Sequence, residues 1–222
     1  MPTALIFGTS RGLGRALVEE HVKRGWEVIG TVRSHDALAH LKSSALTVET
    51  LDTTDWAAVD DLRERLAGRV IDLLFVSAGI IGSVSTPAAD IDPERFSEIM
   101  RVNALAPLRI IDRFADLVHA QGTLAVMSSS LGSIALNKTG GYEDYRMSKA
   151  ALDMGLCSIA ARRKSEQTYL AIDPGWVQTD MGGKNATLTI GQSIPSMVDM
   201  IEARQGSGGV AFVNYANHNH PW

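Results

Sequence analysis

Residues 4–14 read ALIFGTSRGLG and decide the fold, because they join a short apolar run to a glycine-rich turn and a segment of helical periodicity. The glycines fall at Gly8, Gly12 and Gly14, a GxxxGxG spacing directly after the first predicted strand. Glycine permits a tight turn and a close approach of a pyrophosphate to the backbone, and the helix N-terminus that follows attracts the anion. The stretch therefore predicts nucleotide binding, with a simple turn as the alternative.

The same alternation of strands and helices continues along the chain. Further strands are expected at 27–32, 46–51, 71–76, 123–128, 168–173 and 210–215, and helices at 12–23, 36–41, 56–66, 94–100, 104–119 and 144–164. The strands are nearly continuous apolar runs, which is typical of a parallel sheet covered by helices on both faces. We predict an α/β fold with one Rossmann-type, doubly wound parallel sheet of about seven strands. Residues 1–222 are expected to form a single domain that ends in a short substrate loop region.

Composition excludes several classes of function. The chain has 25 Asp and Glu residues and 21 Lys and Arg residues, which gives a net charge of -4. Because the basic residues form no continuous stripe, no nucleic-acid partner is expected. No leader and no apolar run long enough for a bilayer is visible, so we expect a soluble cytoplasmic protein without a membrane partner. The single cysteine, Cys157, cannot form an internal disulfide. The histidines are scattered, so no metal is expected, and His218 and His220 in NHNHPW are interpreted as part of a polar tail.

The end of the second strand indicates which nucleotide is bound. An acidic residue there would bind a ribose 2′-OH, but this sequence has Val32 followed by Arg33. Arg33 and Arg11 can converge on a 2′-phosphate, which favours NADP (NADPH) over NAD. The alternatives are that both arginines are solvated, or that Asp36 binds the ribose of NAD. Asp52, after the third strand, is interpreted either as a ligand of the adenine amino group or as a cap.

A second motif, YRMSK at 145–149, places a tyrosine and a lysine four residues apart in a predicted helix. Such residues share one helix face, so Tyr145 and Lys149 can point into one pocket. A nearby ammonium favours the phenolate and lowers the pKa of the phenol toward neutrality. The pair is therefore suited to proton transfer, although the same spacing also occurs in ordinary amphipathic surface pairs.

Five motifs in this order resemble the short-chain dehydrogenase/reductase superfamily. They are GTSRGLG at 8–14, SAG at 77–79, MSSSLGS at 127–133, YRMSK at 145–149 and DPGWVQTDM at 173–181. The short length and the motifs MSSSLGS and VQTDMGG are similar to a subgroup of carbonyl-reductase-like and C-factor signalling proteins. SAG departs from the Asn-Ala-Gly of the family, which loses an amide but keeps the glycine.

The resemblance implies roles for four catalytic residues. Tyr145 is expected to be the general acid/base at the carbonyl oxygen, and Lys149 to lower its pKa and bind the nicotinamide ribose. Ser129 is expected to orient the carbonyl, with the neighbouring serines 128 and 130 as alternatives because residues 137–142 carry a small insertion. Asn103 matches the asparagine that holds a water in the proton relay, and its alternative is a helix N-cap. Tyr142 has an arginine, not a lysine, four residues later.

The resemblance also implies a cofactor site. Pro174 and Gly175 are expected to turn the chain under the nicotinamide, and Val177 and Thr179 to bind its carboxamide or the pyrophosphate. The full predicted set is Gly8, Ser10, Arg11, Gly12, Leu13, Gly14, Arg33, Asp52, Ala78, Gly79, Asn103, Tyr145, Lys149, Pro174, Gly175, Val177 and Thr179.

Together these features predict an NADP(H)-dependent oxidoreductase that transfers a hydride between nicotinamide and a carbonyl or alcohol substrate. The alternative is a nucleotide-binding signalling or regulatory protein of C-factor type with little metabolic turnover. A sugar epimerase or dehydratase ranks last because the region after residue 181 is short. The substrate is expected to be a small molecule held by Leu131, Ile134, Tyr142, Trp176 and residues 181–194. A homodimer or homotetramer is expected through the helices at 104–119 and 144–164.

Overall fold

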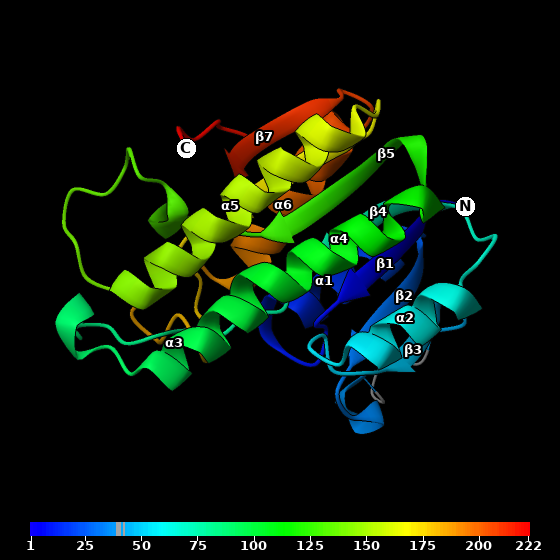
Figure 1. Cartoon of the computed structure of the whole chain (residues 1–222). Helices are drawn as coiled ribbons and strands as arrows, with labels where there is room; N and C mark the ends of the chain where they lie inside the picture. The colour runs from blue at the N-terminus through cyan, green and yellow to red at the C-terminus, as the bar shows by residue number, and fades with distance from the viewer. Residues whose placement is uncertain (39–40, 42) are drawn as a thin grey trace.

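A parallel sheet of seven strands forms the centre of the protein, whose computed structural model describes residues 1–38, 41 and 43–222 (Figure 1). The strands are β1 Thr3–Phe7, β2 Glu27–Val32, β3 Leu46–Thr50, β4 Ile71–Val76, β5 Val118–Met127, β6 Thr168–Asp173 and β7 Gly209–Asn214. Their order, β3-β2-β1-β4-β5-β6-β7, confirms the predicted Rossmann-type fold. The order reverses between β1 and β4, and ligands of such folds bind at the carboxyl ends of the strands near this point.

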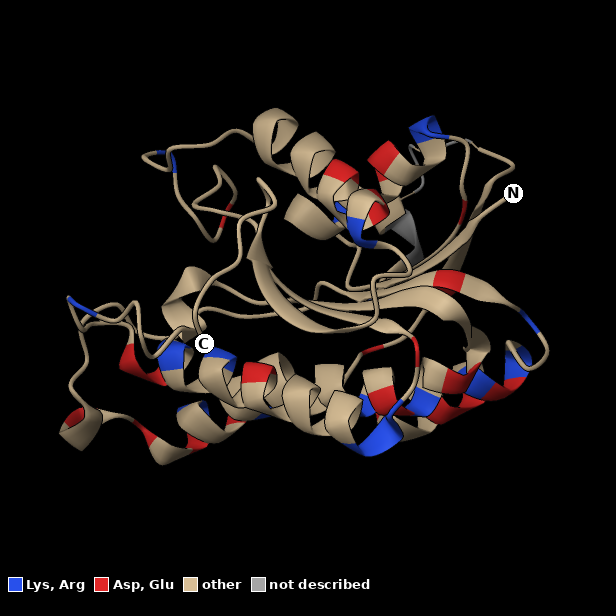
Figure 2. Cartoon of the chain, turned by 90° about the horizontal axis from the view of Figure 1, so that it is seen from above, with Lys and Arg blue, Asp and Glu red and all other residues tan. Residues whose placement is uncertain are grey.

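Helices cover both faces of the sheet, which lies between two layers in Figure 2. The helices are α1 Gly12–Lys23, α2 Trp56–Arg65, α3 Pro93–Met100, α4 Ala106–Phe114, α5 Glu143–Arg163 and α6 Ile190–Arg204. One core joins the sheet to α2, α4 and α5, and there Phe7 meets Phe114 edge to face with ring centroids 5.3 Å apart. The second core joins the opposite face to α1 and α6. Burial on both faces explains the continuous apolar strands.

The helical path before β5 differs from the prediction of one helix over 104–119. It begins with a π-helical turn, Arg101–Leu105, continues as α4 and a 3₁₀ turn, and ends before β5, which already includes His119. Asn103 therefore lies inside a continuous helical path from α3 to α4, and the alternative interpretation of Asn103 as a helix N-cap is wrong. Of the helix expected over 36–41, the structure has a 3₁₀ turn at His35–Leu38, and residues 39 and 40 lie outside the described part.

Helix α6 is missing from the sequence prediction. Glycines before it and Pro195 inside it obscure its helical periodicity, since an interior proline removes a hydrogen bond and disfavours a helix. The helix forms because one side of it, including Ile194, Met197 and Val198, is buried against the sheet. Thr189 and Gln192 form a capping box at its start, and this S/T-x-x-E/Q spacing was a readable signal in the sequence.

Candidate active site

The glycine-rich turn between β1 and α1 is shaped so that side chains are excluded from it. Gly8 has a φ of +84°, and a Cβ there would lie 2.7 Å from the backbone nitrogen of Ala78. A Cβ at Gly14 would lie 2.2 Å from the carbonyl oxygen of Gly8. Gly12, with a φ of +56°, instead faces open space, where Thr179 Cγ2 would be 3.9 Å from a Cβ. The turn thus leaves a bare backbone at the start of α1, as a pyrophosphate site requires.

Two further residues predicted to bind the cofactor lie in the same turn. Ser10 accepts a hydrogen bond at 3.4 Å from the backbone N–H of Arg33, which joins the glycine turn to the end of β2. Leu13 is partly buried and packs against the core between α1 and the sheet. Its side chain anchors the helix start, so only its backbone is free to meet a phosphate.

Arg11 and Arg33, the predicted phosphate ligands, come from the glycine turn and from the loop after β2. The Arg11 guanidinium pairs with Asp180 at 2.7 Å, and both side chains are exposed. This pair links the glycine turn to the segment after β6. The side chain of Asp36, the alternative ligand for NAD, lies outside the described part of the structure.

Asp52 forms a local turn at the end of β3. Its carboxylate accepts hydrogen bonds from the Thr54 backbone N–H at 2.8 Å and from the Thr54 hydroxyl at 2.7 Å. These bonds, together with the charges of Arg33 and Arg101, hold the pKa of Asp52 below its usual value. Helix α2 is capped by Asp55 instead. The carboxylate is therefore ionised at neutral pH and lies within the electrostatic reach of Arg33.

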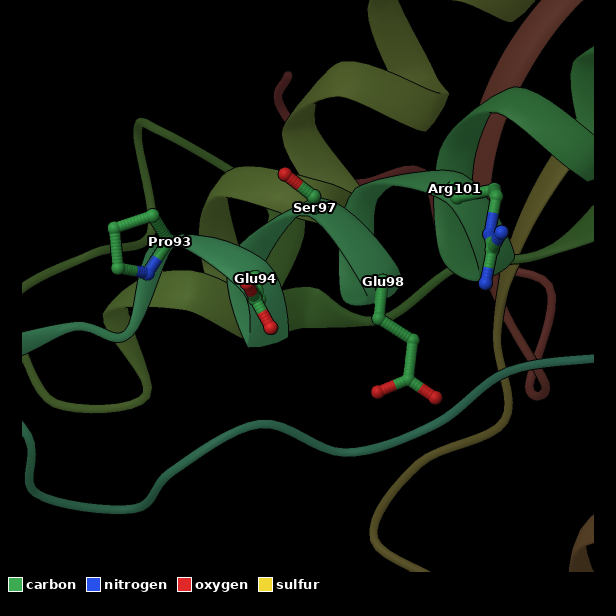
Figure 3. A pocket seen from close by; sticks show the side chains of 5 residues that line it. All are labelled: Pro93, Glu94, Ser97, Glu98 and Arg101. Atoms are coloured by element: carbon green, nitrogen blue, oxygen red, sulfur yellow. The ribbon is translucent and has the colours of Figure 1, made fainter.

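A surface hollow of about 380 Å³ runs along α3, near this end of the molecule (Figure 3). Its lining residues are Pro93, Glu94, Ser97, Glu98 and Arg101. None of them belongs to the predicted catalytic or cofactor set. The hollow is a groove beside one helix, and Arg101 connects it by charge to Asp52.

Tyr145 and Lys149 lie on the buried face of α5, next to the loop that follows β5. Tyr145 is 8% exposed and Lys149 is 2% exposed. The side chain of Ser129 lies close enough to that of Tyr145 to act on its ionisation, and its Oγ accepts the Leu131 N–H at 3.2 Å. Ser128, in contrast, donates its hydroxyl to Asp153 Oδ1 at 2.7 Å. The structure therefore brings Ser129, Tyr145 and Lys149 together and turns Ser128 toward a different partner.

The electrostatics of the pair differ from the expectation that Lys149 lowers the pKa of Tyr145. The Lys149 Nζ atom lies 5.6 Å from the centroid of the tyrosine ring and donates a hydrogen bond to the Met127 carbonyl at 2.8 Å. Burial and then the charge of Asp173 raise the pKa of Tyr145, while the interaction with the Ser129 side chain lowers it. Burial also lowers the pKa of Lys149 to about 8. Desolvation is the largest cause of the shift in the tyrosine, so the phenol is protonated at neutral pH.

Asn103 is fully buried and holds the loop after β4. Its Oδ1 accepts from the Ile80 N–H, and its Nδ2 donates to the Ile80 carbonyl, both at 2.8 Å. Nδ2 also donates to Ser148 Oγ at 3.0 Å. A Cβ at Gly79 would lie 3.4 Å from Asn103 Oδ1 and 3.6 Å from Lys149 Nζ, so glycine lets this loop approach the site. The structure thus brings three separate predicted motifs together at one point.

The segment after β6 forms the opposite wall. Gly175 has a φ of +78°, and the Pro174 carbonyl accepts a hydrogen bond at 2.7 Å from Ser193 in α6. Val177 is buried and pairs with Leu188 in an isolated bridge. The Thr179 hydroxyl accepts the Gly182 N–H at 3.1 Å. These contacts fold residues 175–188 into a closed loop against the sheet end.

The segment after β7 is packed against the site, which corrects its interpretation as a polar tail. His220 Nε2 lies 2.9 Å from Asp173 Oδ2 at the end of β6. The Ser133 hydroxyl donates to the Pro221 carbonyl at 2.6 Å. The ring of Trp222 stacks on that of Phe212, with centroids 5.5 Å apart. The segment therefore connects the loop after β5 with the end of β6.

Tyr142 and Arg146, the pair without a lysine, have a local structural role. Tyr142 precedes α5 with a φ of 53°. Arg146 donates from Nε to the Gly141 carbonyl at 2.9 Å and from Nη2 to the Gly140 carbonyl at 3.2 Å. These bonds brace the loop that precedes α5.

The fold and site define a dinucleotide-binding α/β protein with a serine, a tyrosine and a lysine gathered beside a glycine-rich turn. The profile of the short chain dehydrogenase family matches residues 2–188. The chain belongs to this family and is an oxidoreductase of the short-chain dehydrogenase/reductase type.

Similar proteins include one named C-signal, several dehydrogenases and several carbonyl reductases. C-signal of Myxococcus xanthus is 35% identical over 156 residues, covering 68% of this chain and 93% of the relative. The 1-hydroxy-2-glutathionyl-2-methyl-3-butene dehydrogenase of a Rhodococcus species is 29% identical, covering 91% of each chain. A Burkholderia multivorans protein solved with bound NADP is 41% identical with a TM-score of 0.95, covering 100% of this chain and 99% of that one. A Pseudomonas aeruginosa carbonyl reductase in complex with NADP is 34% identical with a TM-score of 0.89 over the full length of both chains.

Among the described residues, no helix combines the length and apolar character needed to cross a membrane.

Proposed function

We propose that the protein is an NADP(H)-dependent carbonyl reductase in which Tyr145 is the general acid/base. The observation that carries this proposal is the buried pair of Tyr145 and Lys149 on one helix face, with the Ser129 side chain close enough to act on the ionisation of the tyrosine. The site lies beside the loops at the carboxyl ends of β4, β5 and β6, where a ligand of this fold is expected. NADP-bound relatives support the choice of nucleotide.

The residues present fit a dinucleotide. The backbone cradle of Gly8, Gly12 and Gly14 admits no side chain at two of its three positions and opens to space at the third. The first turn of α1 offers free N–H groups to a pyrophosphate. Arg33 and Arg11 would hold the 2′-phosphate, and Lys149 and Thr179 would hold the nicotinamide half. When bound, the nicotinamide supplies or accepts the hydride at a carbonyl or alcohol carbon.

In the proposed mechanism the protein moves one proton. Ser129 orients the substrate oxygen, and the Tyr145 hydroxyl donates its proton to that oxygen during reduction. The raised pKa of Tyr145 keeps this hydroxyl protonated before reaction, which suits a proton donor. The phenolate left behind is stabilised by the Lys149 ammonium and by the Ser129 hydroxyl. Asn103 positions the loop that faces Lys149.

The test compares two tyrosines. Tyr145→Phe removes the hydroxyl and should reduce turnover of a carbonyl panel by at least about 100-fold, followed as NADPH oxidation at 340 nm, with NADPH affinity retained. Tyr169→Phe is the matched control, because Tyr169 is also a buried tyrosine but its hydroxyl contacts Ser165 and Gln167, which lie outside the predicted site. The control should keep its activity. Unchanged turnover in Tyr145→Phe would falsify the acid/base role.

A regulatory role is the second candidate, and the similarity to C-signal of Myxococcus xanthus is the observation that favours it. A nucleotide-dependent regulator would bind NADPH tightly and leave the whole panel of aldehydes, ketones and quinones unreduced. The gathered serine, tyrosine and lysine favour chemistry instead, since binding alone does not need a buried acid/base group.

We further propose a soluble cytoplasmic homodimer or homotetramer that uses the face formed by α4, α5 and the π turn before them. Leu105 is 55% exposed, and Met154 of α5 is 68% exposed. Replacing both by Lys should shift the protein to a smaller species in light scattering, because charge at the centre of an interface disfavours association. An unchanged mass would exclude this face.

A further inference from the structure

The carboxyl group of Asp153 lies buried beneath the catalytic pair and has no part in the mechanism above. Tyr145, Lys149 and Asp153 follow one another at intervals of four residues in α5 and so share one helix face. Asp153 is 4% exposed. Its Oδ1 accepts the Ser128 hydroxyl at 2.7 Å, whereas its buried Oδ2 has no hydrogen-bond partner among the described residues. Such a half-satisfied buried carboxyl is costly and calls for an explanation.

A turn after β5 seals this carboxyl from solvent. The 3₁₀ turn Ser130–Gly132 packs directly on α5, and Gly132 is the point of contact. A Cβ at Gly132 would lie 2.9 Å from Asp153 Oδ2 and 2.9 Å from Lys149 Cβ. Glycine is therefore required for this approach. The result places a carboxyl and an ammonium in one shielded region, where charges interact more strongly than in water.

Each of the two groups acts on the ionisation of the other. Burial lowers the pKa of Lys149 to about 8, and the charge of Asp153 opposes that change. Burial raises the pKa of Asp153 to about 7, while the Ser128 hydrogen bond and the Lys149 charge lower it. A buried lysine without a counter-charge loses its proton more readily still. A neutral amine could not stabilise the Tyr145 phenolate by charge.

We propose that Asp153 is a positioning residue whose buried carboxylate supplies the counter-charge that keeps Lys149 protonated beside Tyr145. The role of this charge in stabilising the Tyr145 phenolate rests on the proposed function, but its effect on the protonation of Lys149 does not. Asparagine could accept the same Ser128 hydrogen bond, so that bond alone would not require a carboxylate. The charge is the property that asparagine lacks.

The ionisable groups around Asp153 come from three elements. They are Tyr145, Lys149 and Cys157 on α5, Asp173 at the end of β6, and His220 after β7, which acts through its contact with Asp173. The negative charge of Asp173 raises the pKa of both Asp153 and Tyr145. The Asp153 charge also raises the pKa of Tyr145. Lys149 is the cation next to Asp153 on the same helix face, so removal of the Asp153 charge should lower the pKa of Lys149.

The experiment measures the ionisation of Lys149 directly. Protein labelled with ¹³Cε-lysine is titrated by NMR, and the Lys149 resonance is assigned by its loss in Lys149→Arg. Asp153→Asn should lower the pKa of Lys149 by roughly one unit or more. Asp112→Asn, a change in α4 of an exposed partner of Arg162, should leave it unchanged. Equal Lys149 titrations in wild type and a folded Asp153→Asn would overturn the proposal, whether or not the protein shows turnover.

The pH profile of kcat gives the functional readout. Its alkaline limb should move to lower pH in Asp153→Asn, because Lys149 then loses its charge earlier. Ser128→Ala keeps the carboxylate but removes its hydrogen bond, so it should raise the pKa of Asp153 and shift the acidic limb upward. This variant also serves if Asp153→Asn fails to fold. If both variants had a lower kcat but their pH profiles rose and fell at the same pH values as the wild-type profile, Asp153 would have only a packing role. That result would refute the inference.

Discussion

Replacement of Arg33 by alanine is the sharpest test of the nucleotide assignment. Arg33 follows β2, and its backbone N–H contacts Ser10 in the glycine turn. Arg33→Ala removes a guanidinium that would bind only the 2′-phosphate of NADPH. A hydrogen bond to a charged group contributes about 1.5–3 kcal/mol, and about 1.4 kcal/mol changes Kd tenfold. The expected loss is therefore about 10- to 150-fold for NADPH and within about twofold for NADH, as for an ordinary surface substitution.

Arg11 should contribute less than Arg33 because it already has a partner. Its guanidinium lies 2.7 Å from Asp180, with the two side chains 65% and 78% exposed. An exposed pair of this kind contributes about 0–1 kcal/mol, and Arg11 must give it up to bind a phosphate. Asp180→Asn removes that competition and should improve NADPH affinity by up to about fivefold. The gain should be smaller for NADH.

Both nucleotides are titrated into each variant and followed by fluorescence. Arg69→Ala is the matched control, since Arg69 is also exposed and pairs with Glu27 at the start of β2, away from the site. Its affinities should equal those of wild type. Equal losses of NADPH and NADH affinity in Arg33→Ala would refute the phosphate assignment and favour a general effect on the glycine turn.

Two predictions concern the fold that carries the site. Gly8→Ala should lower the free energy of unfolding by more than Gly25→Ala: both glycines have a φ above +80°, but only at Gly8 does a Cβ meet backbone, 2.7 Å from the Ala78 nitrogen. Gly25→Ala should cost about 1–2 kcal/mol in chemical denaturation, and equal costs would contradict the close approach. Burial lowers the pKa of His21, whose Nδ1 lies 2.7 Å from the Leu17 carbonyl, so stability is complete above the ordinary value of 6.5 and declines as pH falls below it. His21→Gln should flatten this decline in urea titrations at a series of pH values, and an equally acid-sensitive variant would exclude His21 as its source.

The sheet could be predicted well because its signals are local. Six of the seven strands begin within one residue of their predicted starts, since each apolar run is buried on both faces and bounded by turn residues. The exception is β5, which starts at Val118 and extends through polar residues such as His119 and Gln121. Those residues lack the apolar pattern, so the sequence placed His119 in a helix instead. Helix α6 was missed because the proline inside it disfavours a helix, although the capping-box spacing at its start could have been read in the sequence.

The sequence could predict those parts of the site whose residues belong to a recognisable motif. The spacing of Tyr145 and Lys149 indicated a shared face, but not that burial would raise the pKa of the tyrosine, because desolvation depends on neighbours distant in sequence. The choice among three adjacent serines was likewise open in the sequence. It depends on which way the loop after β5 turns, and the partner of Ser128 is Asp153, 25 residues later.

The contact between His220 and Asp173 is the clearest example of an interaction that a sequence motif cannot predict. The two residues are 47 positions apart, and they meet only because β7 lies beside β6 and the following segment turns back over Phe212. Asp173 in turn raises the pKa of Tyr145. In the same segment the Pro221 carbonyl accepts a hydrogen bond from the Ser133 hydroxyl, which belongs to the loop after β5. The loop after β5 and the end of β6, which both lie near Tyr145, are therefore linked through residues 220–222, so the position of Ser129 and the Asp173 charge near Tyr145 depend on one packed segment.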